Sequence, residues 1–213
     1  MPSCQCEGIE ETFDEESVRD DKKFYERDGA DDTTRWLIEA ISERGVDGHS
    51  LLDIGGGLGA IQHELLTNGA SHAVHVDAST AYLEAARELA QDRELDERIE
   101  WRHGDFVKIA PELEQADVVT LDRVVCCYDD MHSLVEASAK LAGRYYGLVL
   151  PRDTWWLRLG HNIMNIFQRI FRNPFRVFVH PVNEVESIIH DKGLRKVFQR
   201  EDFIWRVALY ARS

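Results

Sequence analysis

Leu51-Leu52-Asp53-Ile54-Gly55-Gly56-Gly57-Leu58-Gly59-Ala60 is the stretch of this chain that decides the fold. Its first four residues, apolar apart from one acid, are typical of the end of a buried strand, and the glycines predict a tight turn. An apolar periodicity typical of a helix then begins at Ala60. Glycine lets a ligand approach the backbone of the turn, and the helix N-terminus offers it unpaired N–H groups. We therefore predict a strand, turn and helix that cradle a nucleotide or nucleoside.

The next two segments of the chain also predict strands that end in an acid. Residues 73–76 lead to Asp77, and residues 99–103 lead shortly afterwards to Asp105. In an open α/β sheet, ligands bind at the edge formed by the carboxyl ends of the strands. Asp53, Asp77 and Asp105 are therefore expected to lie together at that edge.

The glycine spacing by itself leaves two classes of cofactor open. Gly55, Gly57 and Ala60 satisfy the Gly-x-Gly-x-x-Gly/Ala pattern of NAD-binding domains, with Asp77 near the distance expected of the ribose-binding acid. An NAD-dependent oxidoreductase is therefore one alternative. The Gly-Asp-Phe motif at residues 104–106 and a predicted C-terminal hairpin argue against it.

Taken together, the motifs resemble those of the class I S-adenosylmethionine-dependent methyltransferases, over roughly residues 51–213. In that family an Asp-x-Gly-x-Gly-x-Gly motif contacts the methionine part of the cofactor. The resemblance implies that Asp77 accepts both ribose hydroxyls and that Asp105 faces the adenine amino group, with Phe106 beside the ring. The cofactor-binding residues implied in this way are Asp53, Gly55, Gly56, Gly57, Gly59, Asp77, Ala78, Gly104, Asp105, Phe106, Leu121, Asp122, Tyr25 and Arg27.

The segment 122–130 follows a predicted fourth strand, at the place where this fold commonly lines the junction of cofactor and substrate. Here the chain is similar to the magnesium-protoporphyrin O-methyltransferases, which carry an acid, an apolar pair and then His-Tyr. Tyr128 matches the tyrosine, but Cys127 stands in place of the histidine, which argues against a porphyrin acceptor. Tyr128, Asp122 and His180 are the candidate catalytic residues, because a hydroxyl or amine acceptor needs a general base. His132 is a further candidate base.

Hydrophobic periodicity organises the rest of the chain into one α/β domain. It predicts helices at 79–93 and 131–141, the second ended by Gly143, a fifth strand at 145–150, and a closing hairpin of strands 194–199 and 203–210. The predicted fold is a Rossmann-like, seven-stranded, mostly parallel sheet with helices on both faces and a C-terminal antiparallel hairpin. We assign residues 47–213 to an S-adenosylmethionine-binding domain.

Residues 1–46 are expected to form an acidic tail and two covering helices. The first 34 residues hold twelve acids and four bases, which predicts little order in the first dozen. Helices are predicted from Ser17 and over residues 33–41. By the family resemblance such helices cover the cofactor, so Tyr25 and Arg27 between them are expected to touch its methionine end or the substrate. A capped helix junction at the surface is the alternative.

The composition limits the classes of partner. A formal charge of −14, from 39 acids and 25 bases, argues against nucleic acid, because phosphate contacts need a cationic surface. No run of eighteen apolar residues and no apolar leader is present, so we expect a soluble, cytoplasmic protein that acts on a small molecule. The oligomeric state stays open, as does a non-catalytic methyltransferase-like interaction protein.

Residues 152–176 are a cationic, aromatic segment in this acidic chain, with five arginines and one aspartate. They are part of a predicted lid-like helical insertion at 152–180. Three accounts remain open: a core-facing helix with arginines at its rim, a lid over an apolar, anionic substrate, or a helix in peripheral contact with an anionic membrane. For the lid, the candidate substrate-binding residues are Cys127, Tyr128, Arg152, Trp155 and Trp156.

The chain has four cysteines, Cys4, Cys6, Cys126 and Cys127. In a cytosolic protein we expect reduced thiols, and neither pair has the spacing of a four-cysteine zinc site. A soft-metal or metalloid site built from both pairs is the alternative, since thiolates favour soft metals. We predict no metal site.

Overall fold

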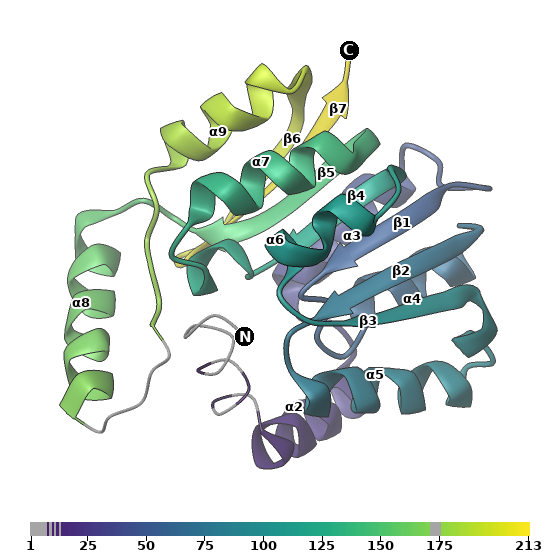
Figure 1. Ribbon diagram of the computed structural model, residues 1–213, viewed down its shortest axis with the longest axis horizontal. Helices are drawn as coiled ribbons and strands as arrows, with labels where there is room; N and C mark the ends of the chain where they lie inside the picture. Colours follow the sequence, from purple (N-terminus) through teal and green to yellow (C-terminus); the bar gives the residue numbers. More distant parts are fainter. Residues whose placement is uncertain (1–7, 9, 11, 13, 171–175) are drawn as a thin grey trace.

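The computed structural model describes residues 8, 10, 12, 14–170 and 176–213, and shows one seven-stranded sheet with helices on both faces (Figure 1). The strand order is β3-β2-β1-β4-β5-β7-β6. Strands from β3 to β5 pair in parallel, whereas β7 is antiparallel to both β5 and β6. The strands are β1 Ser50–Ile54, β2 His72–Asp77, β3 Ile99–His103, β4 Ala116–Asp122, β5 Ala142–Pro151, β6 Leu194–Glu201 and β7 Trp205–Arg212. The predicted fold class is confirmed.

The helices begin where short polar side chains cap their first turns. Asp14, Asp31, Ser79 and Asp130 each accept a hydrogen bond from a backbone N–H of the helix that follows. The helices are α2 Glu15–Asp28, α3 Asp32–Ser42, α4 Ala60–Thr67, α5 Thr80–Asp92, α6 Phe106–Ile109, α7 Met131–Leu141, α8 Trp155–Ile170 and α9 Val182–Asp191. The described residues also include three short 3-10 helices: η1 Asp96–Arg98, η2 Ala110–Glu112 and η3 Val125–Cys127.

Two hydrophobic cores lie on opposite faces of the sheet. Successive strand residues alternate between them, so that Leu51 packs in one core and Leu52 in the other. The first core is completed by α3 and α4, and the second by α7 and α9 (Figure 1). Burial on both faces explains why the parallel strands are almost continuously apolar in sequence.

Helices α2 and α3 form an N-terminal cover, a name we use for residues 15–42. Helix α3 packs on β5 and β7 through Leu37 and Ile41, which are fully buried. Helix α2 contacts α5, where Lys22 forms an ion pair with Glu88 at 2.8 Å. The acidic tail before Asp14 falls mostly outside the described residues.

Two predicted strand boundaries were wrong. The helix predicted at 131–141 is confirmed as α7, but β5 begins at Ala142 and not at Tyr145, so Gly143 lies inside the strand. A Cβ on Gly143 would lie 3.0 Å from the Ala116 carbonyl oxygen, so the glycine allows close strand pairing there. The hairpin turn lies at 202–204 rather than 200–202, because Asp202 accepts hydrogen bonds from the backbone N–H groups of residues 204 and 205.

Helix α8 stands apart from the main body of the domain (Figure 1). It is joined to the β6–β7 turn by Trp156, whose ring stacks on Phe203 with centroids 4.6 Å apart. Within the described part of the chain, no helix is long and apolar enough to cross a membrane.

Candidate cofactor and acceptor site

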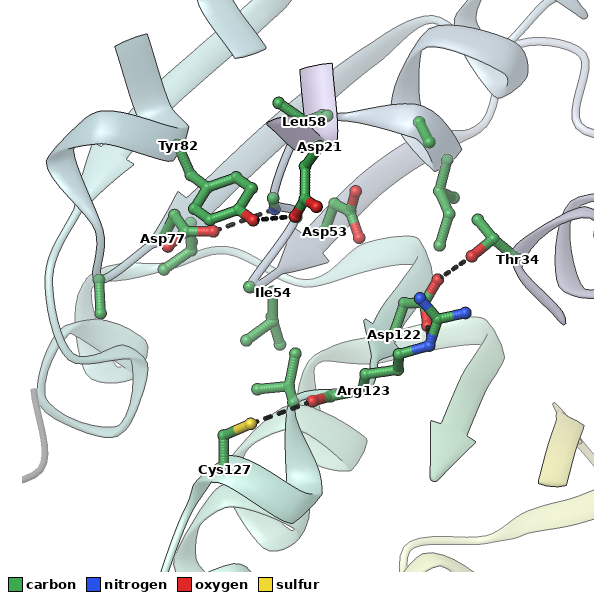
Figure 2. Close-up of a pocket in the computed structure, with 18 of the residues that line it drawn as sticks. Asp21, Thr34, Asp53, Ile54, Leu58, Asp77, Tyr82, Asp122, Arg123 and Cys127 are labelled. Carbon is green, nitrogen blue, oxygen red and sulfur yellow. Dashed lines mark hydrogen bonds and ion pairs between the residues drawn. The ribbon is translucent and has the colours of Figure 1, made fainter. Parts of the chain in front are cut away.

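A cavity of about 410 Å³ opens at the carboxyl ends of β1, β2 and β4, beneath the N-terminal cover (Figure 2). A volume of this size is typical of a small-molecule site. The predicted site residues that line it are Tyr25, Asp53, Gly55, Gly56, Gly57, Asp77, Ala78, Gly104, Asp105, Phe106, Asp122, Cys127 and Tyr128. The fold therefore brings eleven of the fourteen predicted cofactor residues and two predicted acceptor-side residues into one cavity.

The glycine turn between β1 and α4 forms one wall of the cavity. Gly55 has a φ of +61°, and a Cβ there would lie 2.5 Å from Val124 Cγ2. A Cβ on Gly56 would lie 2.6 Å from His75 Cε1. Side chains at these two positions are excluded by the protein itself, so the backbone of the turn faces the cavity directly.

Asp77, at the end of β2, is fastened to the glycine turn. Its Oδ2 atom accepts a hydrogen bond from Gly57 N at 3.0 Å, and Oδ1 accepts one from Ser79 N at 2.8 Å. Burial raises the pKa of this carboxyl, and these backbone donors oppose the shift. Beside it, the Tyr82 hydroxyl donates to Asp21 of α2, so the cover is bonded to the cofactor side of the cavity (Figure 2).

Asp53, at the end of β1, has one oxygen without a partner. Oδ1 accepts a hydrogen bond from Thr120 Oγ1 at 2.7 Å, whereas Oδ2 is buried and has no hydrogen-bond partner among the described residues. Burial raises the pKa of Asp53 to about 7; the Thr120 hydroxyl opposes this shift, and the nearby Asp122 and Asp77 carboxylates add to it. A cation in the cavity would favour the ionised form of this acid.

A buried polar layer that the sequence reasoning missed lies under the glycine turn. His75 Nδ1 and Gln62 Oε1 are 3.0 Å apart, and His63 is buried nearby on α4. Burial lowers the pKa of His75 to about 3 and that of His63 to about 4, so both rings are neutral at pH 7.

Asp105 and Tyr128 meet at the other end of the cavity. The Tyr128 hydroxyl donates to Asp105 Oδ1 at 2.8 Å, and Lys108 Nζ lies 3.1 Å from Oδ2. Asp105 also caps α6 by accepting from Val107 N at 3.2 Å. Burial would raise the pKa of Asp105, but the bonds from Tyr128 and Lys108 hold it below its ordinary value. The predicted adenine acid and the predicted acceptor-side tyrosine are thus direct partners.

Asp122, at the end of β4, is bound to the cover by residues that the sequence reasoning did not select. Thr34 Oγ1 of α3 donates to Asp122 Oδ2, and Arg123 pairs with both Asp122 and Asp31. The Asp31-Asp32-Thr33-Thr34 run was a readable helix-start signal. Nothing in the sequence, however, indicated that this helix start meets the residue after β4.

Seven predicted site residues lie outside the cavity lining, and the reasons differ. Leu121 is fully buried in the core, and Gly59 starts α4 in a left-handed conformation against Gln62 and His63. Arg27 pairs with its neighbour Asp28 at the surface. The remaining four are His180, Arg152, Trp155 and Trp156.

Those four residues have other surroundings. His180 Nε2 lies 2.8 Å from the Tyr128 carbonyl oxygen, so it supports the backbone of Tyr128 and does not face the cavity. Arg152 pairs with Glu201 at 3.0 Å, Trp156 stacks on the hairpin turn, and the Trp155 side chain is 77% exposed. The lid contacts expected of residues 152–156 are therefore not formed in this structure.

The described cysteines form a close pair without further metal ligands. Cys126 Sγ and Cys127 Sγ are 3.8 Å apart, and both thiols donate to the Arg123 carbonyl oxygen. Among the described residues, no group of three or more His, Cys, Asp or Glu side chains could hold a metal ion. Cys4 and Cys6 lie outside the described residues.

The sheet order, the closing hairpin and the acid-rimmed glycine turn define the class I methyltransferase fold. Residues 51–143 match the family model described as a methyltransferase domain. The resemblance noted from sequence is therefore confirmed, together with the expected enzyme class and S-adenosylmethionine as its cofactor.

Solved structures share the fold at low sequence identity. Magnesium protoporphyrin IX methyltransferase from Synechocystis PCC 6803 with bound SAM has a TM-score of 0.72 and 16% identity, covering 98% of this chain and 97% of that chain. An O-methyltransferase family protein from Burkholderia thailandensis has a TM-score of 0.64 and 20% identity, covering 84% of this chain and 56% of that chain. A putative sarcosine dimethylglycine methyltransferase from Galdieria sulphuraria has a TM-score of 0.66 and 16% identity, covering 85% of each chain. No curated protein matches the sequence.

Proposed function

We propose that this methyltransferase transfers the methyl group of S-adenosylmethionine to a small, largely apolar molecule that binds beneath the N-terminal cover. The observation that carries the proposal is one cavity that joins the glycine turn and its acids to Cys127 and Tyr128. Several fold neighbours are named as enzymes of small molecules, including the protoporphyrin enzyme. This supports a small acceptor without specifying which one.

The residues present fit the cofactor. Asp53 lines the cavity and its buried Oδ2 has no hydrogen-bond partner among the described residues, an acid suited to a cation, and the cofactor carries a sulfonium and an ammonium group. Gly55 and Gly56 line the same cavity without side chains, so a ligand can lie against the backbone of the turn. We assign Asp53 and the glycine turn to the methionine part, Asp77 to the ribose, and Asp105 with Phe106 to the adenine.

Bound S-adenosylmethionine supplies an electrophilic methyl group, so the protein has mainly to align the acceptor and exclude water. Alignment alone can contribute about 7 to 11 kcal/mol in ideal cases. We assign proton transfer from a hydroxyl or amine acceptor to Asp122, which ends β4 at the cavity wall, or to Tyr128, whose hydroxyl would pass its own proton to Asp105 as it takes up that of the acceptor. His180 positions Tyr128 through its backbone carbonyl.

The lining favours an apolar or neutral acceptor over the anionic one that the sequence also suggested. Among the described residues that line the cavity, Arg123 is the only base, and it already lies between Asp31 and Asp122. Six aspartates line the same cavity: Asp21, Asp31, Asp53, Asp77, Asp105 and Asp122. An anion would meet this negative charge, whereas Phe24, Val124 and Leu134 offer apolar contact.

Ligand-induced stabilisation tests the proposal directly. We expect S-adenosylmethionine and S-adenosylhomocysteine, at about 100 times their Kd, to raise Tm by about 5 to 10 °C, and NAD and NADP to leave it unchanged. Mass spectrometry of small molecules that copurify with the protein would then supply acceptor candidates. Stabilisation by NAD alone would refute the cofactor assignment.

The Tyr128→Phe variant separates acceptor-side from cofactor-side roles. Loss of the hydroxyl should lower kcat for methyl transfer about tenfold, because the group that would take up the acceptor's proton and pass its own to Asp105 is removed. Cofactor affinity should change by no more than about twofold, since Asp105 keeps its contacts with Lys108 and Val107 N. Calorimetry that shows loss of cofactor binding in this variant would contradict the division of roles.

We also propose peripheral contact between residues 152–176 and an anionic membrane. The side chains of Trp155, Leu159 and Phe203 are 77%, 52% and 73% exposed, and Trp156 joins the helix to Phe203. Large exposed apolar side chains beside arginines are typical of interfacial helices.

In cosedimentation, the Trp155→Ala/Phe203→Ala variant should bind vesicles containing phosphatidylglycerol about tenfold more weakly than the unmodified protein. Val197→Ala, which removes an exposed apolar side chain from β6, is the control and should bind normally. Equal binding of all three proteins would exclude this surface as the contact.

A further inference from the structure

Arg123 has an unusual backbone conformation at the carboxyl end of β4. Its φ is +60°, a left-handed value that non-glycine residues adopt only where the surroundings enforce it. The surroundings here are bonds on both sides of the residue. Arg123 N donates to the Val149 carbonyl oxygen at 2.9 Å, and its own carbonyl accepts the thiols of Cys126 at 3.1 Å and Cys127 at 3.4 Å.

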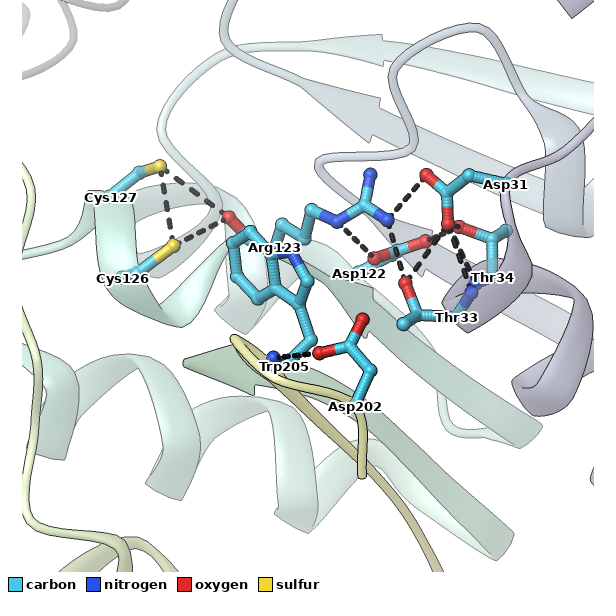
Figure 3. A network of polar contacts seen from close by, with 9 residues as sticks. All are labelled: Asp31, Thr33, Thr34, Asp122, Arg123, Cys126, Cys127, Asp202 and Trp205. Atoms are coloured by element: carbon cyan, nitrogen blue, oxygen red, sulfur yellow. Dashed lines mark hydrogen bonds and ion pairs between the residues drawn. The ribbon is translucent and has the colours of Figure 1, made fainter. Parts of the chain in front are cut away.

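This conformation directs the guanidinium toward the start of α3 (Figure 3). Nη2 donates to Thr33 Oγ1 at 2.7 Å and forms an ion pair with Asp31. Nε lies 3.7 Å from Asp122 Oδ1, and the guanidinium carbon lies 5.1 Å from the centre of the Trp205 ring. One side chain therefore contacts the N-terminal cover, the end of β4 and the C-terminal hairpin.

The two carboxylates beside Arg123 also hold the first turn of α3. Asp31 caps the helix by accepting from the backbone N–H groups of Thr33 and Thr34, each at 3.1 Å. Thr34 in turn donates to Asp122. Without a cation between them, Asp31 and Asp122 would repel each other, and the cover would be pushed from the sheet.

We propose that Arg123 is a positioning residue, which clamps the N-terminal cover onto the end of β4 and orients the Asp122 carboxylate at the cavity wall. The cover also bears Asp21, Phe24 and Tyr25, which line the cavity. The clamp therefore couples closure over the cofactor to the geometry of the acceptor side.

Hydrogen exchange and calorimetry test the clamp without an acceptor. Arg123→Gln keeps a side chain at the same backbone position but removes the charge. We expect faster amide exchange in α3 and about tenfold weaker binding of S-adenosylhomocysteine, because the closed cover is populated less. Arg144→Gln is the matched control: it breaks an arginine–aspartate pair with Asp117, 3.1 Å long, at the opposite end of the sheet. It should change neither quantity.

The pH profile of methyl transfer, which rests on the proposed function, tests the effect on Asp122. Burial raises the pKa of Asp122, and the negative charge of Asp31 raises it further. The charge of Arg123 and the hydrogen bond from Thr34 lower this pKa. Asp53 is the other acid that faces Asp122. Loss of Arg123 should raise that pKa further, so the acid limb of kcat/KM should move up by about one pH unit. Arg123→Lys keeps the positive charge but lacks the planar guanidinium group. Its acid limb of kcat/KM should therefore stay at the wild-type pH, while the amides of α3 should still exchange faster than in the wild type.

Unchanged exchange in α3 together with unchanged S-adenosylhomocysteine affinity in Arg123→Gln would overturn the clamp. An acid limb that does not move would overturn the role toward Asp122. If Arg123→Gln does not fold, Asp31→Asn breaks the same link from the cover side and must give the same changes in α3 exchange and in S-adenosylhomocysteine affinity. A wild-type protein that fails to bind S-adenosylhomocysteine would refute the proposed function, while the exchange difference in α3 would still decide the clamp.

Discussion

The Asp77→Ala variant is expected to bind S-adenosylhomocysteine about 100-fold more weakly than the wild type, because two charge-assisted bonds to the ribose are lost. Each such bond contributes about 1.5 to 3 kcal/mol, and partial relaxation of the site reduces the sum. The structure adds a second cause. Without the carboxylate, the N–H groups of Gly57 and Ser79 lose their acceptor, so the glycine turn is less well held. Isothermal titration calorimetry measures the loss directly.

Two variants make this result specific. Asp77→Asn keeps the shape and one acceptor oxygen, so the affinity should fall only about tenfold. Asp117→Ala removes a carboxylate that also accepts a backbone N–H, that of Ser50 at 3.0 Å, but at the amino end of the sheet. It should lower stability and leave affinity unchanged. Wild-type affinity in Asp77→Ala would show that the ribose binds elsewhere.

The Gly55→Ala variant should lose about 2 to 5 kcal/mol of the free energy of unfolding, even without a cofactor. A φ of +61° costs an alanine about 1 to 2 kcal/mol. The new Cβ would also lie 2.5 Å from Val124 Cγ2, and overpacking of this kind costs about 1 to 3 kcal/mol more. Urea denaturation of the unliganded protein gives the value.

Gly57→Ala is the matched control for backbone strain. Its φ is +53°, but the nearest atom to a new Cβ is 3.8 Å away on Tyr82. It should therefore lose only the strain contribution, about 1 to 2 kcal/mol. In a double-mutant cycle, Val124→Ala should recover about 1 to 2 kcal/mol in the Gly55→Ala background. If Gly55→Ala loses no more unfolding free energy than Gly57→Ala, or shows no coupling with Val124→Ala, a clash with Val124 does not explain the loss.

Most of the fold could be predicted from local patterns. The strand before Gly55, the acid at Asp77 and the capped helix after Ser79 each have a short-range cause: an apolar run, a glycine turn or a side-chain cap. The errors lie at strand boundaries. The fifth strand was expected to begin at Tyr145, after Gly143, but it begins at Ala142, and the glycine serves close strand pairing, which depends on a neighbouring strand.

The part of the candidate site that consists of a local sequence motif was predictable. The part formed by contacts between distant segments of the chain was not. The glycine turn and its acids line the cavity as expected. The residues assigned at 152–156 do not, because Arg152 finds Glu201 and Trp156 finds Phe203 in a hairpin about fifty residues away in the chain. Such partners are set by packing and leave no local signal.

The sequence by itself determined the class of fold, the ligand-binding edge and the acids that stand on it, because strand periodicity and glycine conformation act over a few residues. Only the tertiary structure decided how that edge is closed. The Tyr128–Asp105 bond and the contact of Arg123 with Asp31 join residues 23 and 92 positions apart in the chain, and the cover packs on strands that lie still further along it. Their energies arise from burial and paired charge, which exist only once the sheet has brought those residues together.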